Sequence, residues 1–423
     1  MKKTSVFAKM AAMTLAVSSM ALFGAGCSGS SGPVKISYWN SFTGSDGETL
    51  TALVNKFNED NKGKYEIEMN IMSQDAYAQK LPTALATRTG PELMTVTPND
   101  LITYSRQKYL WNIGDVFKKT GLDKNDLTQT ALDFGTVDDN LYGLPLEVFA
   151  TYLYWNKDLF KAAGLDPEKA PATLDELAVD AIKIAKPAKS LYGFAMPVKG
   201  APQFYAGFIR GNGGAVVDAK GVKSVLDSPE NIATYETIRK LAYEKKVSPV
   251  GASGVDMDNV MFSGKLGMYM NGPWLIPGLK SHNINFGVAA IPAGSKGAST
   301  ILDGAIFAVA KTATGQKKEA AYAFLKYWNS TAVGKGWAQK VGFPPYLKSV
   351  IVDPEVKANP IITTLAQSMS SGIATTWLVG VKGGARIDSD VLFPLIEQLQ
   401  NGAKADEAVR QASDSIDKIL SGN

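Results

Sequence analysis

Short segments of alternating apolar residues are separated by segments in which apolar residues have helical spacing. Alternation over residues 34–38 predicts a strand, and apolar residues at i, i+3, i+4 and i+7 over 50–57 predict a helix. Residues 65–71 alternate again, 77–87 have helical spacing, and 93–97 form a further apolar run. This βαβαβ order predicts an open α/β sheet that binds ligands at the carboxyl ends of its strands.

A second α/β region follows Gly143-Leu-Pro145. Thr173 to Glu176 has the capping-box pattern of a helix, and Ser228-Pro229 has the pattern of another helix start. The chain closes with apolar residues at helical spacing over 409–419. Its 423 residues predict two or three domains. Because no internal repeat and no long linker interrupts the pattern, we expect two lobes between which the chain crosses more than once, rather than independent domains.

The first residues have the layout of a secretory signal, with Lys ahead of a short apolar run. The alternative is a transmembrane anchor, but the run of about 17 residues is at the lower limit for crossing a bilayer. L-F-G-A-G-C-S-G-S resembles the bacterial lipobox, although Gly24 stands where Leu is usual. We therefore expect a signal peptide over 1–26, lipid attachment at Cys27, and a flexible tether over 27–33.

Charge and composition exclude several classes of function. The net charge of +4 falls to +1 when residues 1–26 are removed, because they hold three Lys and no acid. No basic run with interleaved aromatics occurs, so nucleic acid is not an expected partner. With one Cys and one His, an intrachain disulfide is impossible, and neither a metal site nor a cofactor is predicted. His282, in a polar segment, is interpreted as a surface residue.

No catalytic residue can be nominated from the sequence. The chain lacks a nucleophile–base pattern, a phosphate loop and a zinc-protease motif. A glycoside hydrolase remains the enzyme alternative, because acid pairs occur in any chain of this length. The protein is therefore expected to bind a ligand rather than to transform it.

Aromatic residues recur beside polar residues at the predicted turns. Rings can cover the apolar C–H faces of a sugar while carboxylates, amides and hydroxyls bind its hydroxyl groups. The candidate ligand-binding residues are Trp39, Ser41, Thr43, Asp46, Asn99, Asp100, Glu147, Phe149, Tyr152, Tyr205, Trp274, Asp303, Trp377 and Arg386.

Each candidate also has a purely structural interpretation. Trp39, Trp274 and Trp377 could pack in a core, Asp46 could cap a helix, and Arg386 could form a salt bridge. Glu147 and Asp303 could be surface or hinge residues. The four remaining tryptophans are assigned to packing: Trp111, Trp155, Trp328 and Trp337.

Several motifs together resemble the extracellular solute-binding proteins of bacterial ABC transporters, in the cluster that includes maltose-binding protein. They are I-S-Y-W-N-S-F-T-G-S-D-G, L-Y-G-L-P-L-E-V-F-A-T-Y-L-Y-W-N-K-D-L-F, F-S-G-K-L-G-M-Y-M-N-G-P-W and G-F-P-P-Y-L-K-S-V. The resemblance implies the two-lobed α/β fold of type II periplasmic binding proteins, with a ligand cleft between lobes and a hinge of crossing segments. It also implies a monomer that delivers a carbohydrate to permease subunits.

The resemblance implies roles for particular residues. Trp274 would stack on sugar rings, Trp377 is the best match to a second stacking Trp, and Trp39 to Asp46 match the first cleft loop. One lobe would comprise 34–147 and about 303–350, and the other 148–302 and about 351–423. The hinge would lie near Glu147–Thr151 and near the crossings around 303 and 350.

Two points stay open from the sequence. A phosphorylated small molecule such as a glycerophosphodiester is an alternative ligand, with Arg210 and Arg386 as candidate contacts. The expected location is the outer face of the cell membrane, and the lipid anchor favours a Gram-positive envelope.

Overall fold

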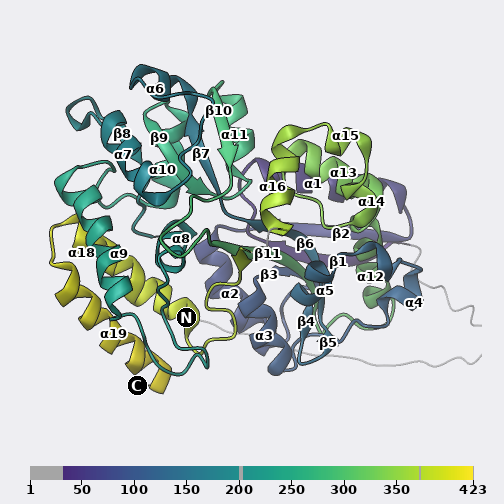
Figure 1. Cartoon of the computed structure of the whole chain (residues 1–423). Helices are drawn as coiled ribbons and strands as arrows, with labels where there is room; N and C mark the ends of the chain where they lie inside the picture. The colour runs from purple at the N-terminus through teal and green to yellow at the C-terminus, as the bar shows by residue number, and fades with distance from the viewer. Residues whose placement is uncertain (1–31, 200–202, 371–372, 423) are drawn as a thin grey trace, which may run out of the picture.

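The computed structural model describes residues 32–199, 203–370 and 373–422. It shows two α/β lobes side by side, each built on its own sheet (Figure 1). The two-lobed α/β fold expected from the sequence is therefore confirmed. Cys27 lies outside the described residues. Within the described ranges, every helix is too short or too polar to cross a bilayer.

The first lobe is built on a sheet with strand order β12-β11-β3-β1-β2, in which β6 also pairs with β11. Its strands are β1 (Val34–Asn40), β2 (Tyr65–Ile71), β3 (Leu93–Val96), β6 (Gly143–Ala150), β11 (Thr300–Val309) and β12 (Ala374–Thr375). β1 is parallel to β2 and β3, whereas β11 is antiparallel to β3 and β6. The predicted βαβαβ opening is confirmed.

Helices cover the sheet of the first lobe (Figure 1). They are α1 (Ser45–Asp60), α2 (Gln74–Ala86), α3 (Pro98–Arg106), α4 (Val116–Thr120), α5 (Gln129–Phe134), α12 (Gln316–Trp328), α13 (Thr331–Val341), α14 (Lys348–Ile351) and α15 (Pro354–Lys357). The predicted apolar face of α1 is buried through Leu50, Val54 and Phe57. A small hairpin, β4 (Thr136–Val137) and β5 (Asn140–Leu141), lies beside them.

The second lobe has a four-stranded sheet of order β10-β7-β9-β8. Its strands are β7 (Tyr152–Asn156), β8 (Tyr192–Phe194), β9 (Leu266–Asn271) and β10 (Phe286–Ala289). Its helices are α6 (Lys157–Ala162), α7 (Leu174–Ile184), α8 (Gln203–Gly211), α9 (Pro229–Arg239), α10 (Gly254–Phe262), α11 (Leu275–Ser281), α17 (Gly384–Arg386), the π-helical η4 (Ile387–Leu392), α18 (Phe393–Gln400) and α19 (Ala405–Ser421). The apolar face predicted over 409–419 is buried in this lobe.

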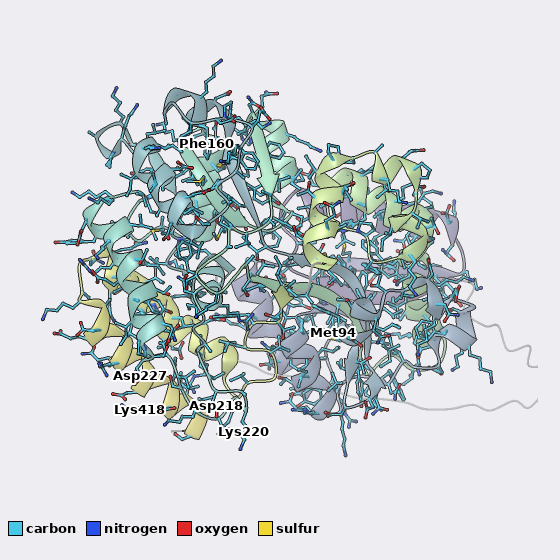
Figure 2. All side chains as sticks on the ribbon, in the orientation of Figure 1. Met94, Phe160, Asp218, Lys220, Asp227 and Lys418 are labelled. Atoms are coloured by element: carbon cyan, nitrogen blue, oxygen red, sulfur yellow. The ribbon has the colours of Figure 1, made fainter. Side chains whose placement is uncertain are left out.

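Each lobe has its own hydrophobic core. Met94 belongs to the core of the first lobe and Phe160 to that of the second, on opposite sides of the molecule (Figure 2). Trp328 and Trp337 pack in the first core and Trp155 in the second, while Trp111 packs partly against the first. The packing role predicted for these four tryptophans is confirmed.

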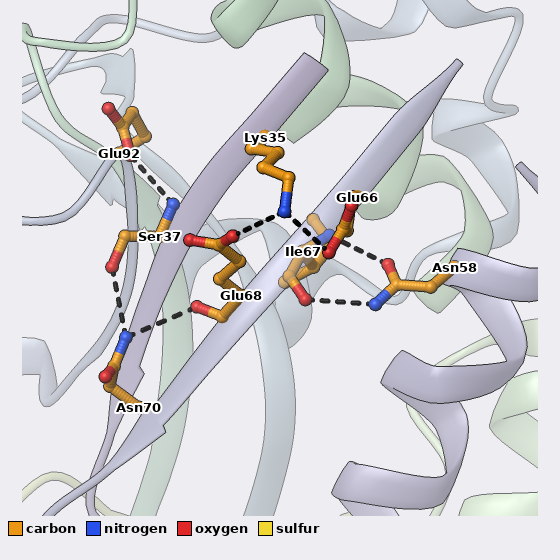
Figure 3. A network of polar contacts seen from close by, with 8 residues as sticks. All are labelled: Lys35, Ser37, Asn58, Glu66, Ile67, Glu68, Asn70 and Glu92. Atoms are coloured by element: carbon orange, nitrogen blue, oxygen red, sulfur yellow. Dashed lines mark hydrogen bonds and ion pairs between the residues drawn. The ribbon is translucent and has the colours of Figure 1, made fainter. Parts of the chain in front are cut away.

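β2 is the edge strand of the first sheet, and side-chain polar contacts lie along it (Figure 3). The side-chain amide of Asn58 on α1 donates to the carbonyl of Ile67 at 3.0 Å and accepts from its N–H at 2.8 Å. Lys35 on β1 bridges Glu66 and Glu68 of β2. Because an unpaired edge strand can recruit another chain, the amide of Asn58 protects this edge.

The chain passes between the lobes at three places. β6 continues through Thr151 into β7, β11 enters the first sheet from the second lobe, and α16 (Pro360–Ser370) leads from α15 towards β12. Two buried residues connect the first two passages. The N–H of Thr151 donates to Oγ1 of Thr300 at 3.1 Å, and that hydroxyl donates back to the carbonyl of Thr151 at 2.9 Å.

Candidate functional site

A cleft of about 740 Å³ lies between the lobes. The first lobe contributes residues after β1, on α2 and at the start of α3, and the crossing strands β6 and β11 form the floor. The second lobe contributes residues of α10, the β9–α11 turn and α11. The lining includes Ser41, Phe42, Thr43, Asp46, Gln74, Tyr77, Thr95, Thr97, Asp100, Tyr104, Glu147, Phe149, Val255, Asp258, Phe262, Trp274, Gly278 and Asp303.

The loop after β1 brings Ser41, Thr43 and Asp46 into the cleft. The Ser41 hydroxyl donates to Oε1 of Gln74 at 2.8 Å, which joins this loop to α2. Asp46 lies in the first turn of α1, where its Oδ1 accepts from the N–H of Gly47. Burial raises the pKa of Asp46 from its ordinary value. The position of these side chains in the cleft could be predicted from the sequence, because they follow directly after a parallel strand.

The start of α3 forms the next part of the wall. Thr97 caps this helix, and its hydroxyl donates to Oδ2 of Asp100 at 2.8 Å. Burial raises the pKa of Asp100. Asn99 is absent from the lining; its Oδ1 accepts from the N–H of Gly380 at 3.0 Å and so joins the first lobe to the segment after β12.

The floor of the cleft carries two acids and a ring. β6 and β11 pair so that Ala305 faces Glu147 and Asp303 faces Phe149. Glu147 is only 4% exposed, and its Oε2 has no hydrogen-bond partner among the described residues. Burial, followed by the negative charge of Asp46, raises the pKa of Glu147 well above its ordinary value, and the nearby Trp337 indole N–H offsets this rise only in part. Burial also raises the pKa of Asp303 to about 6.

Trp274 forms the aromatic part of the second lobe's wall. Its ring makes an edge contact with Phe149, with centroids 5.0 Å apart. The ring folds back over Gly272, where an added Cβ would lie 2.0 Å from a ring carbon. The glycine in N-G-P-W therefore gives the Trp ring its position. Asn271 in the same turn donates to Oδ1 of Asp258 at 2.9 Å.

The predicted set missed the helix faces that line the cleft. Val255, Asp258 and Phe262 share one face of α10, while residues 74, 77, 78 and 81 share one face of α2. Tyr104 lies one turn after Asp100. The i, i+3, i+4 spacing was the available signal, but it equally fits a packed face. Burial raises the pKa of Asp258 to about 7.

Besides Asn99, three predicted residues lie away from the cleft. Trp39 is half-buried on β1, and Nζ of Lys80 lies 4.7 Å from its ring centroid. Tyr152 is fully buried in β7, and its hydroxyl donates to the carbonyl of Leu365. The Arg386 side chain is 64% exposed and pairs with Asp390. We therefore remove these three residues from the predicted set. The helix α2 covers Trp39, and Tyr152 is buried within the second sheet.

Tyr205 and Trp377 form a separate buried cluster near the floor, with ring centroids 6.3 Å apart. The Trp377 indole N–H donates to Asp388 at 3.0 Å, and the charge of Asp303 is close enough to raise the pKa of Asp388, which burial chiefly brings to about 7. Arg210 stacks on Trp377 at 4.9 Å. Neither ring is among the lining residues, so this cluster supports the wall from behind.

The chemistry of the lining is acidic, hydroxylic and aromatic. Among the described lining residues, none is Lys, Arg or His. No group of three potential metal ligands occurs among the residues the structure describes. His282 is exposed as predicted, and it stacks on Phe262 from outside the cleft. The arrangement can hold a polyhydroxylated ligand by hydrogen bonds and ring contacts.

Comparisons with known proteins agree with this architecture. The chain is 26% identical over 332 residues to the sn-glycerol-3-phosphate-binding periplasmic protein of Escherichia coli, which covers 74% of each chain. A solute-binding protein of Thermotoga lettingae bound with α-D-tagatose superimposes with a TM-score of 0.81 at 23% identity, covering 91% of this chain and 99% of that one. A substrate-binding protein of Listeria monocytogenes in complex with cycloalternan gives 0.80 at 21% identity, with 92% and 99% covered.

The family model described as bacterial extracellular solute-binding protein matches residues 52–364. That range includes both crossing strands and most of the residues that line the cleft. The glycoside hydrolase alternative is thereby set aside. The chain belongs to the bacterial extracellular solute-binding proteins, and it is a solute-binding component of an ABC transporter rather than an enzyme.

Proposed function

We propose that the protein captures a saccharide, most simply an oligosaccharide, between its lobes and delivers it unchanged to the permease. The observation that carries this proposal is the composition of the cleft. Trp274, Phe149 and Phe262 supply rings for sugar C–H faces, while Ser41, Thr97 and the five carboxyl groups supply partners for hydroxyl groups. The cleft volume of about 740 Å³ suits a ligand of this size.

A phosphorylated ligand is the rival, because the Escherichia coli relative is named for sn-glycerol-3-phosphate. A phosphate site needs convergent donors of positive charge. Arg210 uses its guanidinium on Thr375 and on the carbonyl of Thr376, and Arg386 lies outside the cleft. An acidic lining without a cation repels a phosphate group. The engagement of both arginines elsewhere and the acidic lining therefore favour a saccharide over a phosphorylated ligand.

Transport would depend on closure of the two lobes around the ligand. The paired strands β6 and β11, with the Thr151–Thr300 bonds, form the proposed hinge, and α16 forms a third connection. Val356 and Ile362 pack in the first core and Leu365 in the cluster around β7 and β9, so the third crossing lies within α16. A ligand that contacts both walls favours the closed state by its higher affinity for it.

We further propose that a lipid on Cys27 holds the protein at the outer face of the membrane as a monomer. The support is the signal-like start and the lipobox-like stretch before Cys27. The wild-type protein should incorporate a labelled fatty acid, and Cys27→Ser should not. Absence of label from the wild-type protein would contradict lipid anchoring.

A thermal-shift panel tests the ligand class. Neutral and amine-bearing oligosaccharides are compared with sugar phosphates and glycerophosphodiesters at equal concentrations. A saccharide at 100 times its Kd should stabilise the protein by about 2.7 kcal/mol. Stabilisation by the phosphate compounds alone would transfer the function to the rival class.

A further inference from the structure

Carboxyl groups enter the cleft from several separate elements. They are Asp46 on α1, Asp100 on α3, Glu147 on β6, Asp258 on α10 and Asp303 on β11, with Asp388 of η4 behind Asp303. No side chain of opposite charge accompanies them among the described lining residues. A neutral sugar would leave these carboxyl groups without a compensating charge whenever they are ionised.

Glu147 is the most buried acid of the lining, and the Trp337 indole N–H lies close enough to offset part of its raised pKa. Glu147 is nine-tenths or more buried, yet its Oε2 has no hydrogen-bond partner among the described residues. Its carboxylate is within electrostatic reach of Asp46 on the wall of the first lobe and of Asp303 on the floor. A buried carboxylate without a donor is costly, so this oxygen indicates a donor that the ligand supplies.

We propose that the saccharide bound here carries a protonated amine, as a sugar with a free amino group does, and that the ammonium lies against Glu147, where the charges of Asp46 and Asp303 add to its attraction. This inference rests on the proposed function and names the substrate class. An ammonium group has three donors and no acceptor, so it can donate to Oε2 of Glu147 while its charge attracts the other carboxylates of the floor and wall. A hydroxyl donates only one hydrogen bond and brings no charge.

The aromatic wall suits the same ligand. Trp274 and Phe149 lie beside the acidic floor, with the Phe149 ring next to Asp303 in the strand pair. A ring face attracts a cation and also covers sugar C–H groups. No cluster of metal ligands occurs among the described residues, so the site does not fit a metal ion.

Proton linkage supports the inference. Burial raises the pKa of Asp303 to about 6, that of Asp258 to about 7, and that of Glu147 further above its ordinary value. The other titratable groups of the lining are Asp46, Tyr77, Asp100 and Tyr104, with Asp388 behind the floor. A bound ammonium favours the ionised carboxylates. Binding near neutral pH should therefore release protons from the carboxyl groups, whereas a neutral sugar should release none.

Titration calorimetry on matched disaccharides tests the proposal. Disaccharides with gluco and with galacto configuration are each used in 2-amino, 2-hydroxy and 2-acetamido forms. Each titration is done in two buffers of different ionisation enthalpy, which measures the protons released on binding. In the tightest-binding set, the amine should bind at least about tenfold more tightly than its two partners, a difference of about 1.4 kcal/mol. Proton release should accompany the amine alone.

Variants separate the site from general charge. Glu147→Gln and Asp303→Asn should each remove most of the preference for the amine. Asp138→Asn, in an exposed ion pair of the first lobe, should keep it. Hydroxyl or acetamido forms that bind as tightly as the amine would overturn this inference and leave the proposed function standing. Failure of every disaccharide to bind would overturn the inference as well, and binding of a glycerophosphodiester instead would overturn both.

Discussion

Trp274 reaches the cleft because the residue two positions before it is glycine. Any side chain at Gly272 would meet the indole ring, and the ring would then have to leave Phe149. The N-G-P-W turn therefore holds the Trp274 ring in the position where it lines the cleft. This local geometry can be predicted from the sequence, because it depends on residues that are adjacent in the chain.

Replacement of Trp274 by Ala should weaken saccharide binding by at least about tenfold, through loss of ring contact area. The melting temperature of the unliganded protein should fall by only a few degrees, because the ring is half-buried and its edge contact with Phe149 is worth about 1 kcal/mol. Calorimetry gives the affinity and a thermal melt gives the stability.

Trp111→Ala is the matched control, because Trp111 packs partly against the same core outside the cleft. It should lower the melting temperature and leave the affinity unchanged. Unchanged affinity in Trp274→Ala, combined with a large loss of stability, would assign this tryptophan to packing alone.

Glu147 predicts a pH dependence of stability. Its folded-state pKa lies above the ordinary 4.5, so the folded protein binds the proton more tightly than the unfolded chain. Stability contributed by the protonated form is therefore lost as the pH rises from about 4.5 through the raised pKa. Glu147→Gln should be more stable than the wild type at pH 8 by at least about 1 kcal/mol, and this difference should shrink at pH 5.

Urea unfolding at the two pH values measures the effect. The comparison is made without saccharide, so that ligand binding does not contribute. A variant that is less stable than the wild type at pH 8 would show that the carboxylate is stabilised by groups other than those described here.

At the scale of elements, the faces that line the cleft belong to helices whose pattern alone does not reveal their role. α2 and α10 present residues at helical spacing, which equally predicts a face packed on a core. Trp39 and Tyr152 show the opposite case: Trp39 lies near the end of β1 and Tyr152 begins β7, but other elements cover both side chains. Strand ends predict the neighbourhood of the site, whereas side-chain access depends on how distant helices pack.

The sheet edge gives a prediction that is independent of the ligand. Asn58→Ala should remove both hydrogen bonds to Ile67 and lower the free energy of unfolding by about 1–2 kcal/mol. Hydrogen exchange at the Ile67 amide should accelerate, while saccharide affinity should not change.

Asn55→Ala on the same helix is the control, because Asn55 is exposed and both side-chain hydrogen bonds to Ile67 come from Asn58. It should have little effect on stability. Equal effects of the two substitutions would show that helix propensity, and not protection of the edge, explains the loss.

At the scale of the whole molecule, the two lobes and the repeated crossing of the chain between them could be predicted from the order of motifs and the absence of a linker. The position of the third crossing could not be predicted. α14 and α15 have four residues each, and no local pattern shows which lobe these helices and α16 pack against. Val356 and Ile362 belong to the first core only through contacts with residues far away in sequence. The acidic character of the cleft likewise depends on residues brought together from both lobes.

The central claim is that one saccharide is held by both lobes and draws them together. Cys27 is the only cysteine, so Cys27→Ser allows labels at Gln79→Cys on α2 and Asn259→Cys on α10, both exposed on helices that flank the cleft. Double electron–electron resonance between spin labels at these positions measures the separation of the walls. The account predicts a shorter and narrower distance distribution when the saccharide is bound, and an unchanged distribution at full occupancy would contradict it.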